Sequence, residues 1–127
     1  MKSSVNDSVV IRVSRHAISS LSMRELDTFL AAVTAANDAI NGVLNQPRCG
    51  GDVYRQVEAF QDGFNKIIDL AIGVGKEATP ATLDEAEERA FVLIHHQAGL
   101  RDDFQSIGNL VDQMRRDMEP FMKGATE

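Results

Sequence analysis

The chain has 127 residues, with 13 Lys and Arg against 19 Asp and Glu, a net charge of −6 and 43% hydrophobic residues. This length fits one domain that buries a core, and the apolar fraction excludes wholesale disorder. No run of 18 apolar residues occurs and residues 1–20 lack a long apolar stretch, so we expect neither a membrane span nor a signal peptide. With Cys49 as the single cysteine, we expect a cytoplasmic protein.

Charge is unevenly distributed along the chain. Residues 1–25 carry a net charge of +2, and the remaining 102 residues carry −8. An acidic body disfavours nucleic acid as a partner, because neutralising phosphates requires a basic surface.

Residues 1–21 are predicted to form an extended basic arm. Within it, residues 8–14 alternate with a period of two and are rich in β-branched residues, which predicts a short strand. A single strand cannot satisfy its own backbone groups, so we expect its partner in another chain. The candidate contact residues on this arm are Val9, Ile11, Arg12 and Val13.

Two helices are predicted next, over about 23–45 and 53–74. Ser22 and Glu25 form a capping box at the start of the first helix, and Pro47 with Gly50 ends it. The second helix carries apolar residues at alternating spacings of three and four up to Val74.

The third predicted helix covers about 83–119 and is opened by a second capping box, Thr82 to Glu85. A stripe with spacings of three and four runs through it without a slip: Leu83, Ala86, Ala90, Leu93, Gln97, Leu100, Phe104, Ile107, Val111, Met114, Met118 and Phe121. This continuous register favours one unbroken helix. Gly99 and the cap-like run 102–105 instead predict a break at 99–102 and two helices.

The predicted fold is therefore all-α: an antiparallel bundle of three long or four shorter helices over residues 22–121, preceded by a short extended N-terminal arm and followed by a tail over 122–127. An unbroken third helix would outreach the other two. Its end, with Met114, Met118 and Phe121, would then need cover from a second copy, so we expect a homo-oligomer, with a dimer the simplest case.

Arg89 and His96 raise an enzymatic alternative. The run from Arg89 to His95 and His96 resembles the R-x4–6-H motif of the HEPN ribonucleases, which are all-helical, and Ala90 stands where that family usually has a polar residue. The resemblance implies a dimeric ribonuclease that uses Arg89 and His96 at the scissile phosphate. The reading we prefer places both as solvated side chains flanking the apolar stripe.

No pattern predicts a metal or cofactor. His95 and His96 diverge by about 100° on a helix, whereas one metal site prefers ligands three or four residues apart. The run from Gly73 to Lys76 lacks the spacing of a phosphate-binding loop.

The arm raises a third alternative. A basic strand followed by helices resembles the ribbon-helix-helix repressors, which implies DNA binding through the arm. The leading prediction is a non-enzymatic, homo-oligomeric helical interaction protein that binds or inhibits another macromolecule, with an unidentified protein as its partner.

Overall fold

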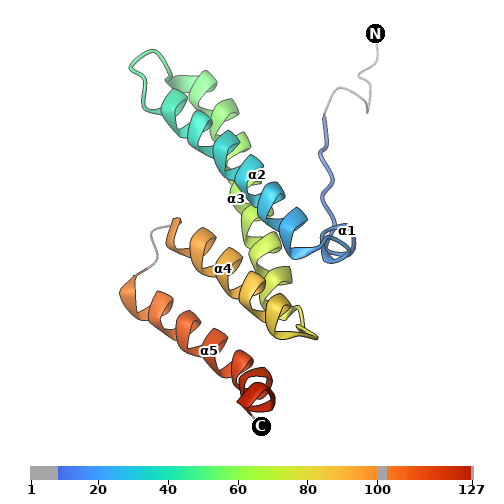
Figure 1. The fold of residues 1–127 in the computed structure, drawn as a ribbon. Coiled ribbons are helices and arrows are strands. Elements are labelled where there is room, and N and C mark those ends of the chain that lie inside the picture. The colour runs from blue at the N-terminus through green and yellow to red at the C-terminus, as the bar shows by residue number, and fades with distance from the viewer. Residues whose placement is uncertain (1–8, 100–102, 127) are drawn as a thin grey trace.

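The computed structural model describes residues 9–99 and 103–126, and within these ranges it contains five helices and no strand (Figure 1). The all-α prediction is confirmed, in its four-helix form with one additional short helix. The helices are α1 (Arg15–Ser19), α2 (Met23–Leu44), α3 (Gly51–Glu77), α4 (Leu83–Gly99) and α5 (Phe104–Thr126).

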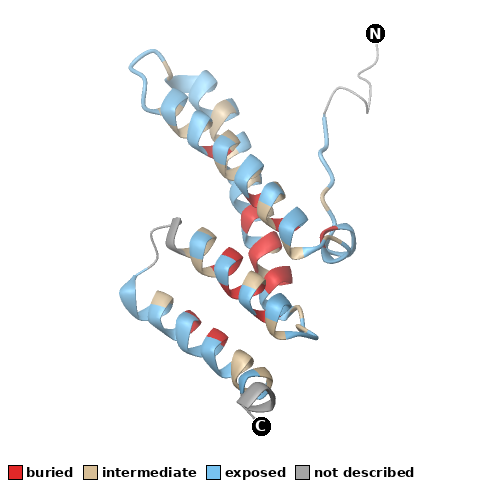
Figure 2. Cartoon of the chain, in the orientation of Figure 1, coloured by how far each residue is buried: buried red, intermediate tan, exposed pale blue. Residues whose placement is uncertain are grey.

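The helices form two antiparallel hairpins of unequal length (Figure 1). α2 and α3 make the long hairpin, and α4 packs against its lower half. α5 packs on α4. Buried residues gather where α2, α3 and α4 meet, with a further set on the inner side of α5 (Figure 2). This core includes Leu26, Leu30, Ile68, Ala71, Leu93 and Met114.

Within the core, α3 approaches α4 closely at Gly75. A Cβ atom at this position would lie 2.8 Å from Leu93 Cδ2 and 3.2 Å from Leu26 Cδ2. Both leucines are fully buried. A larger residue at Gly75 would therefore require the Leu93 side chain to shift within a close-packed core.

The N-terminal arm differs from the prediction. Residues 9–14 form no strand, and residues 1–8 lie outside the described residues. The expected extended arm through residue 21 is interrupted by α1, which the Ser14 hydroxyl caps by accepting a hydrogen bond from the Ala17 N–H at 3.1 Å. Ile18 is buried in the core and holds this turn in place. Within the described residues no strand pairs with residues 9–14, so their backbone groups lack the partner that the predicted strand requires, and one buried residue and a cap suffice to fix the short helix that follows.

The predicted capping box at the start of α2 is confirmed. The Ser22 N–H donates to Glu25 Oε1 at 2.9 Å, and the Glu25 N–H donates to the Ser22 hydroxyl at 3.1 Å. The Ser22 backbone hydrogen bond, assisted by the Ser22 side chain, lowers the pKa of the Glu25 carboxyl below its usual value. The charged form of Glu25 is thus favoured by folding.

A pH dependence follows from this capping box. Because the pKa of Glu25 is lowered in the folded state, its contribution to stability is present above the unfolded pKa of about 4.3 and is lost as pH falls through the folded pKa. We expect Glu25→Gln to show a smaller loss of unfolding free energy than wild type between about pH 5 and pH 3. Chemical denaturation at each pH measures this. Glu87→Gln, on the exposed surface of α4, is the control and should follow the wild-type curve; equal slopes for all three proteins would contradict the prediction.

The unbroken helix over 83–119 is wrong. α4 ends at Gly99 and α5 starts at Phe104; residues 100–102 lie outside the described residues. Asp103 caps α5, with its Oδ1 accepting from the Ser106 N–H at 2.7 Å, and this bond lowers the pKa of Asp103. The local cap signals therefore outweighed the continuous register, since a helix that folds back on α4 buries its stripe within the same chain.

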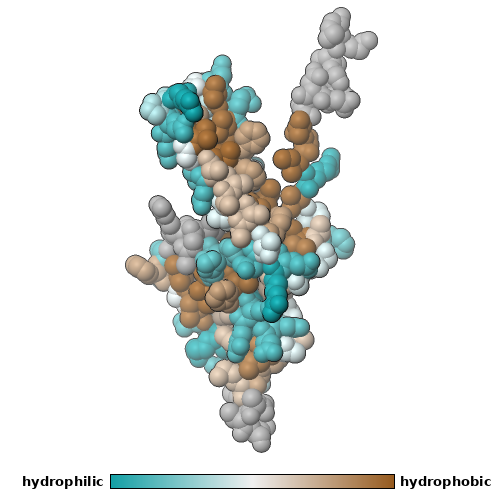
Figure 3. Space-filling model, turned by 45° about the horizontal axis from the view of Figure 1, so that its top comes forward, coloured by the Kyte–Doolittle hydropathy of each residue, from teal (hydrophilic) through white to brown (hydrophobic). Residues whose placement is uncertain are grey.

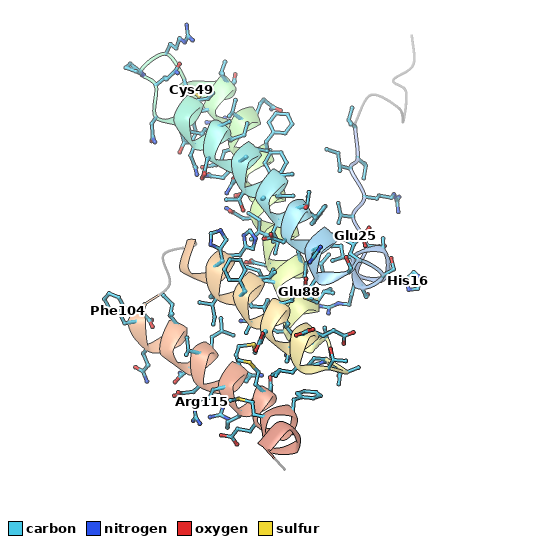
Figure 4. All side chains as sticks on the ribbon, in the orientation of Figure 1. His16, Glu25, Cys49, Glu88, Phe104 and Arg115 are labelled. Atoms are coloured by element: carbon cyan, nitrogen blue, oxygen red, sulfur yellow. The ribbon has the colours of Figure 1, made fainter. Side chains whose placement is uncertain are left out.

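Two residues of the stripe do not face the core beyond this break. Phe104 and Val111 are exposed, at 94% and 42%, whereas Leu110 and Met114 face the core. Figure 4 shows Phe104 pointing away from α4. α5 also continues through Pro120 to Thr126, past the predicted end at about 119–121 and into the predicted tail. Pro120 has no N–H, so the Arg116 carbonyl lacks its usual intrahelical donor there.

Candidate interaction surface

Arg89 was expected on the solvated side of α4, and this is wrong. Its side chain is 6% exposed and joins three elements. Nε donates to the Gly75 carbonyl at 3.0 Å, and Nη2 donates to the Lys76 carbonyl at 2.7 Å. Nη1 pairs with Asp117 of α5 at 3.2 Å. Arg89 thus satisfies carbonyls at the end of α3, which have no intrahelical donors, and anchors α5 to the body.

His96 is also less solvated than expected. Its side chain is 9% exposed, and Nε2 lies 2.7 Å from Asp27 Oδ1 on α2. Its neighbour His95 is exposed and stacks on Phe91, with ring centroids 6.0 Å apart. The two histidines thus face different surroundings on adjacent helix positions.

Arg89 and His96 do not converge on one open site. Arg89 is directed to the end of α3 and to α5, and His96 is directed to α2. Each is engaged by protein groups, Arg89 through all three of its guanidinium nitrogens and His96 through Nε2. Within residues 9–99 and 103–126, no group of three His, Cys, Asp or Glu side chains could hold a metal ion.

The C-terminal candidates lie mostly inside a single copy. Met114 is 2% exposed, and the partly buried Met118 packs against the core cluster. Phe121 is partly buried at a surface depression of about 420 Å³ that Lys76, Arg116 and Pro120 also line. These three residues therefore do not form the exposed apolar surface that was expected at this end, because α5 folds back on α4 instead of extending beyond the bundle.

The arm residues remain available for contact. Val9 and Ile11 are 91% and 72% exposed, and Arg12 is exposed as well. Val13 differs, because it is partly buried against the core cluster. Two of the predicted apolar contact residues therefore face solvent, and the third fixes the arm to the body.

The half of the α2–α3 hairpin far from α4 carries a surface that sequence reasoning missed. We call residues 33–67 the distal hairpin. Between Leu30 and Ile68, a stretch that the structure describes completely, no hydrophobic residue is buried. The distal hairpin nevertheless contains large apolar side chains: Val43, Val53, Tyr54 and Phe60 are between 37% and 58% exposed. Figure 3 shows apolar residues gathered at the end of this hairpin.

Hydrogen-bonded amides occupy the contact between the two helices of the distal hairpin. Asn37 Nδ2 donates to Asn65 Oδ1 at 2.9 Å, and Gln61 donates to Asn41. Asn37 is only 9% exposed, and its own Oδ1 has no hydrogen-bond partner within the described part of the chain. Polar pairs of this kind fix the register of two helices at some cost in stability.

Apolar residues directly precede these amides in the sequence and lie beside them on the helix surface. Ile40 precedes Asn41 and Phe60 precedes Gln61, so each is rotated by about 100° from its neighbour in the same sense. Because α2 and α3 run antiparallel, equal rotations bring both residues out on the same side of the pair. We call this surface the hairpin face; it consists of Val33, Ala36, Ile40, Val43, Val53, Val57, Phe60, Phe64 and Ile67.

Charged residues avoid the hairpin face. The residues that follow the amides, namely Asp38, Asp62 and Lys66, are rotated to the opposite side of the hairpin. On α3, the six charged residues up to position 69 fall within one arc of about 120° on that opposite side: Asp52, Arg55, Glu58, Asp62, Lys66 and Asp69. The distal hairpin is therefore amphipathic: on its apolar side Val43, Val53 and Phe60 are exposed, and the other residues of the hairpin face are half-buried.

No family model, no curated protein and no solved structure matches this chain. Among the described residues, no helix is both long enough and apolar enough to cross a membrane.

Proposed function

We propose that the chain is a non-enzymatic helical interaction protein whose main docking surface is the hairpin face, with the exposed arm as a second contact. The observation that carries this proposal is the arrangement of the distal hairpin. Two pairs of hydrogen-bonded amides lie in the contact between its helices, and Val43, Val53 and Phe60 on the hairpin face are exposed. Contiguous exposed apolar surface without charges is typical of protein interfaces.

The proposal is favoured over the HEPN-like ribonuclease by the positions of Arg89 and His96. Arg89 and His96 are each held by protein partners, and both act in the packing of α4 against its neighbours. The body around α4 thus serves as a stable base from which the distal hairpin projects (Figure 1).

Site-specific photo-crosslinking in cells tests whether the hairpin face is occupied. We expect a photoreactive p-benzoyl-phenylalanine introduced at Phe60 to give adducts of higher mass on irradiation. The same group at Lys66, on the opposite side of α3, should give none because that side carries the solvated charges.

Mass spectrometry of the adduct identifies what lies on the hairpin face, and either a second copy or a different protein supports the proposed function. Equal yields at the two positions, or no adduct at Phe60, would contradict it. Circular dichroism of both variants verifies that the helical content is kept.

A further inference from the structure

We infer that the surface depression between the end of α3 and the side of α5 binds a small organic anion with an apolar body, such as an aryl carboxylate. We call it the α5 depression; its volume is about 420 Å³, and it is lined by residues 76–80, Arg89 and one side of α5 between Gln113 and Phe121. It lies outside the hairpin face, so this inference goes beyond the proposed function and does not depend on it.

The guanidinium group of Arg89 holds the two sides of the α5 depression together. Nη2 donates to the Lys76 carbonyl at 2.7 Å, and Nη1 donates to Asp117 Oδ2 at 3.2 Å. Because Nη1 and Nη2 belong to one planar group, the end of α3 and the middle of α5 are fixed close to each other. The α5 depression is therefore built into the fold of a single copy, as small-molecule sites usually are.

The two carboxylates that line the α5 depression are paired with arginines. Asp117 pairs with the buried Arg89 at 3.2 Å, and Glu77 pairs with Arg15 at 2.7 Å. The C-terminal end of a helix also carries a partial negative charge, but at the end of α3 the guanidinium of Arg89 binds two of the carbonyls that produce it. The negative groups at the depression are thus compensated from within the chain.

Two cations at the α5 depression have no such partner. Lys76 and Arg116 both line it and are exposed, and neither forms an ion pair with any residue that the structure describes. They leave a local surplus of two positive charges on a chain whose net charge is −6. A carboxylate placed between them gains charge-assisted hydrogen bonds from both side chains.

The acidic start of α4 does not line the α5 depression. Glu85 accepts a hydrogen bond from the Ala81 N–H at 2.7 Å, and Glu88 pairs with Arg24 at 2.9 Å. Because salt screens exposed charges beyond about 8 Å, an anion in the depression is influenced mainly by the cations that touch it. The negative charge of the whole chain therefore does not exclude an anion from this site.

Apolar side chains form another part of the lining. Pro80 and Phe121 are half-buried at the depression, and Pro120 lies beside them on its exposed rim. A small inorganic anion would leave these rings uncovered, whereas an aromatic ring can lie against them while its carboxylate reaches the two cations. A mainly apolar lining with a few polar groups is typical of small-molecule sites, and 420 Å³ falls within their usual range of about 300–1,000 Å³.

The test is an NMR titration of the ¹⁵N-labelled chain with 2-naphthoate, an aryl carboxylate that serves as the probe. We expect the backbone amide signals of Lys76, Thr79, Arg116 and Phe121, which line the depression, to shift and to saturate. A probe of this size in an open site should bind with a Kd on the order of 1 mM. The neutral analogue 2-naphthamide, added at the same concentration, should produce much smaller shifts because it lacks the charge.

Arg116→Gln should raise the Kd of 2-naphthoate about 3-fold to 5-fold, the effect of losing one exposed charge pair. Arg115→Gln is the matched control, because it removes the same charge from the adjacent exposed position. Arg115 lies about 160° around the α5 axis from Gln113, a residue of the lining, so this variant should bind like wild type. Circular dichroism verifies that both variants keep their helical content.

Any of four results would overturn the inference. These are the absence of saturable shifts with 2-naphthoate, shifts centred on the hairpin face around Phe60, equal shifts with 2-naphthamide, and an equal Kd for the Arg116→Gln and Arg115→Gln variants. Crosslinking at Phe60 tests the hairpin face separately, so each of these results would refute the anion site and leave the proposed function standing.

Discussion

Arg89→Ala is expected to lower the free energy of unfolding by about 3–5 kcal/mol, the range for removing one partner of a buried charged pair. The loss arises because the carbonyls of Gly75 and Lys76 lose their donors and Asp117 loses its cation in the same step. Urea denaturation followed by circular dichroism measures the change. Arg89→Lys keeps the charge with fewer directed donors, so it should recover part of the loss.

Arg115 provides the control for Arg89. It lies on α5, exposed, and pairs with Glu119 one turn away at 3.0 Å. Arg115→Ala should change the free energy of unfolding by less than about 1 kcal/mol, as is usual for a surface pair. If Arg89→Ala had an effect as small as that of Arg115→Ala, the three interactions of Arg89 would contribute nothing to the fold, and the buried anchor described above would be disproved.

Gly75→Ala is expected to destabilise the fold by about 1–3 kcal/mol, against the usual preference for alanine in a helix. Replacing glycine with alanine inside a helix ordinarily stabilises it by up to about 1 kcal/mol. Here the added methyl group would lie 2.8 Å from Leu93 Cδ2, and Leu93 is 0% exposed. The sign of the change is therefore reversed by packing.

Gly63→Ala is the comparison in the same helix. A Cβ atom at Gly63 meets no other atom within 4 Å, so this substitution should stabilise α3 by up to about 1 kcal/mol. Thermal denaturation of both variants, each compared with wild type at the same protein concentration, shows whether each substitution raises or lowers stability. A stabilising effect of Gly75→Ala would show that Leu93 and Leu26 can move aside.

The sequence predicted the helices better than it predicted what covers them. The capping box of Ser22 and Glu25 is a local signal, and the structure contains it as expected. The apolar stripe of α3 was also identified, but periodicity alone cannot distinguish a side chain covered by α4 from one that projects beyond it. That difference depends on α4 being 10 residues shorter than α3, which follows from the break at Gly99.

The burial of Arg89 and His96 was not predictable for a related reason. Both side chains are satisfied by groups distant in sequence, at the end of α3 and on α2. Nothing in the local spacing of α4 indicates which helix will lie against it. The hairpin face did leave a signal in the sequence: the charges of α3 recur every three or four residues opposite the apolar stripe.

The concentration of buried residues at one end of the long hairpin has a consequence for how this chain can change over time. Positions that hold the molecule together and positions of the proposed docking surface occupy different stretches of the same two helices. Substitutions near the tip can therefore alter the proposed docking surface without lowering the stability of the fold. Binding and stability are thus free to change independently during evolution.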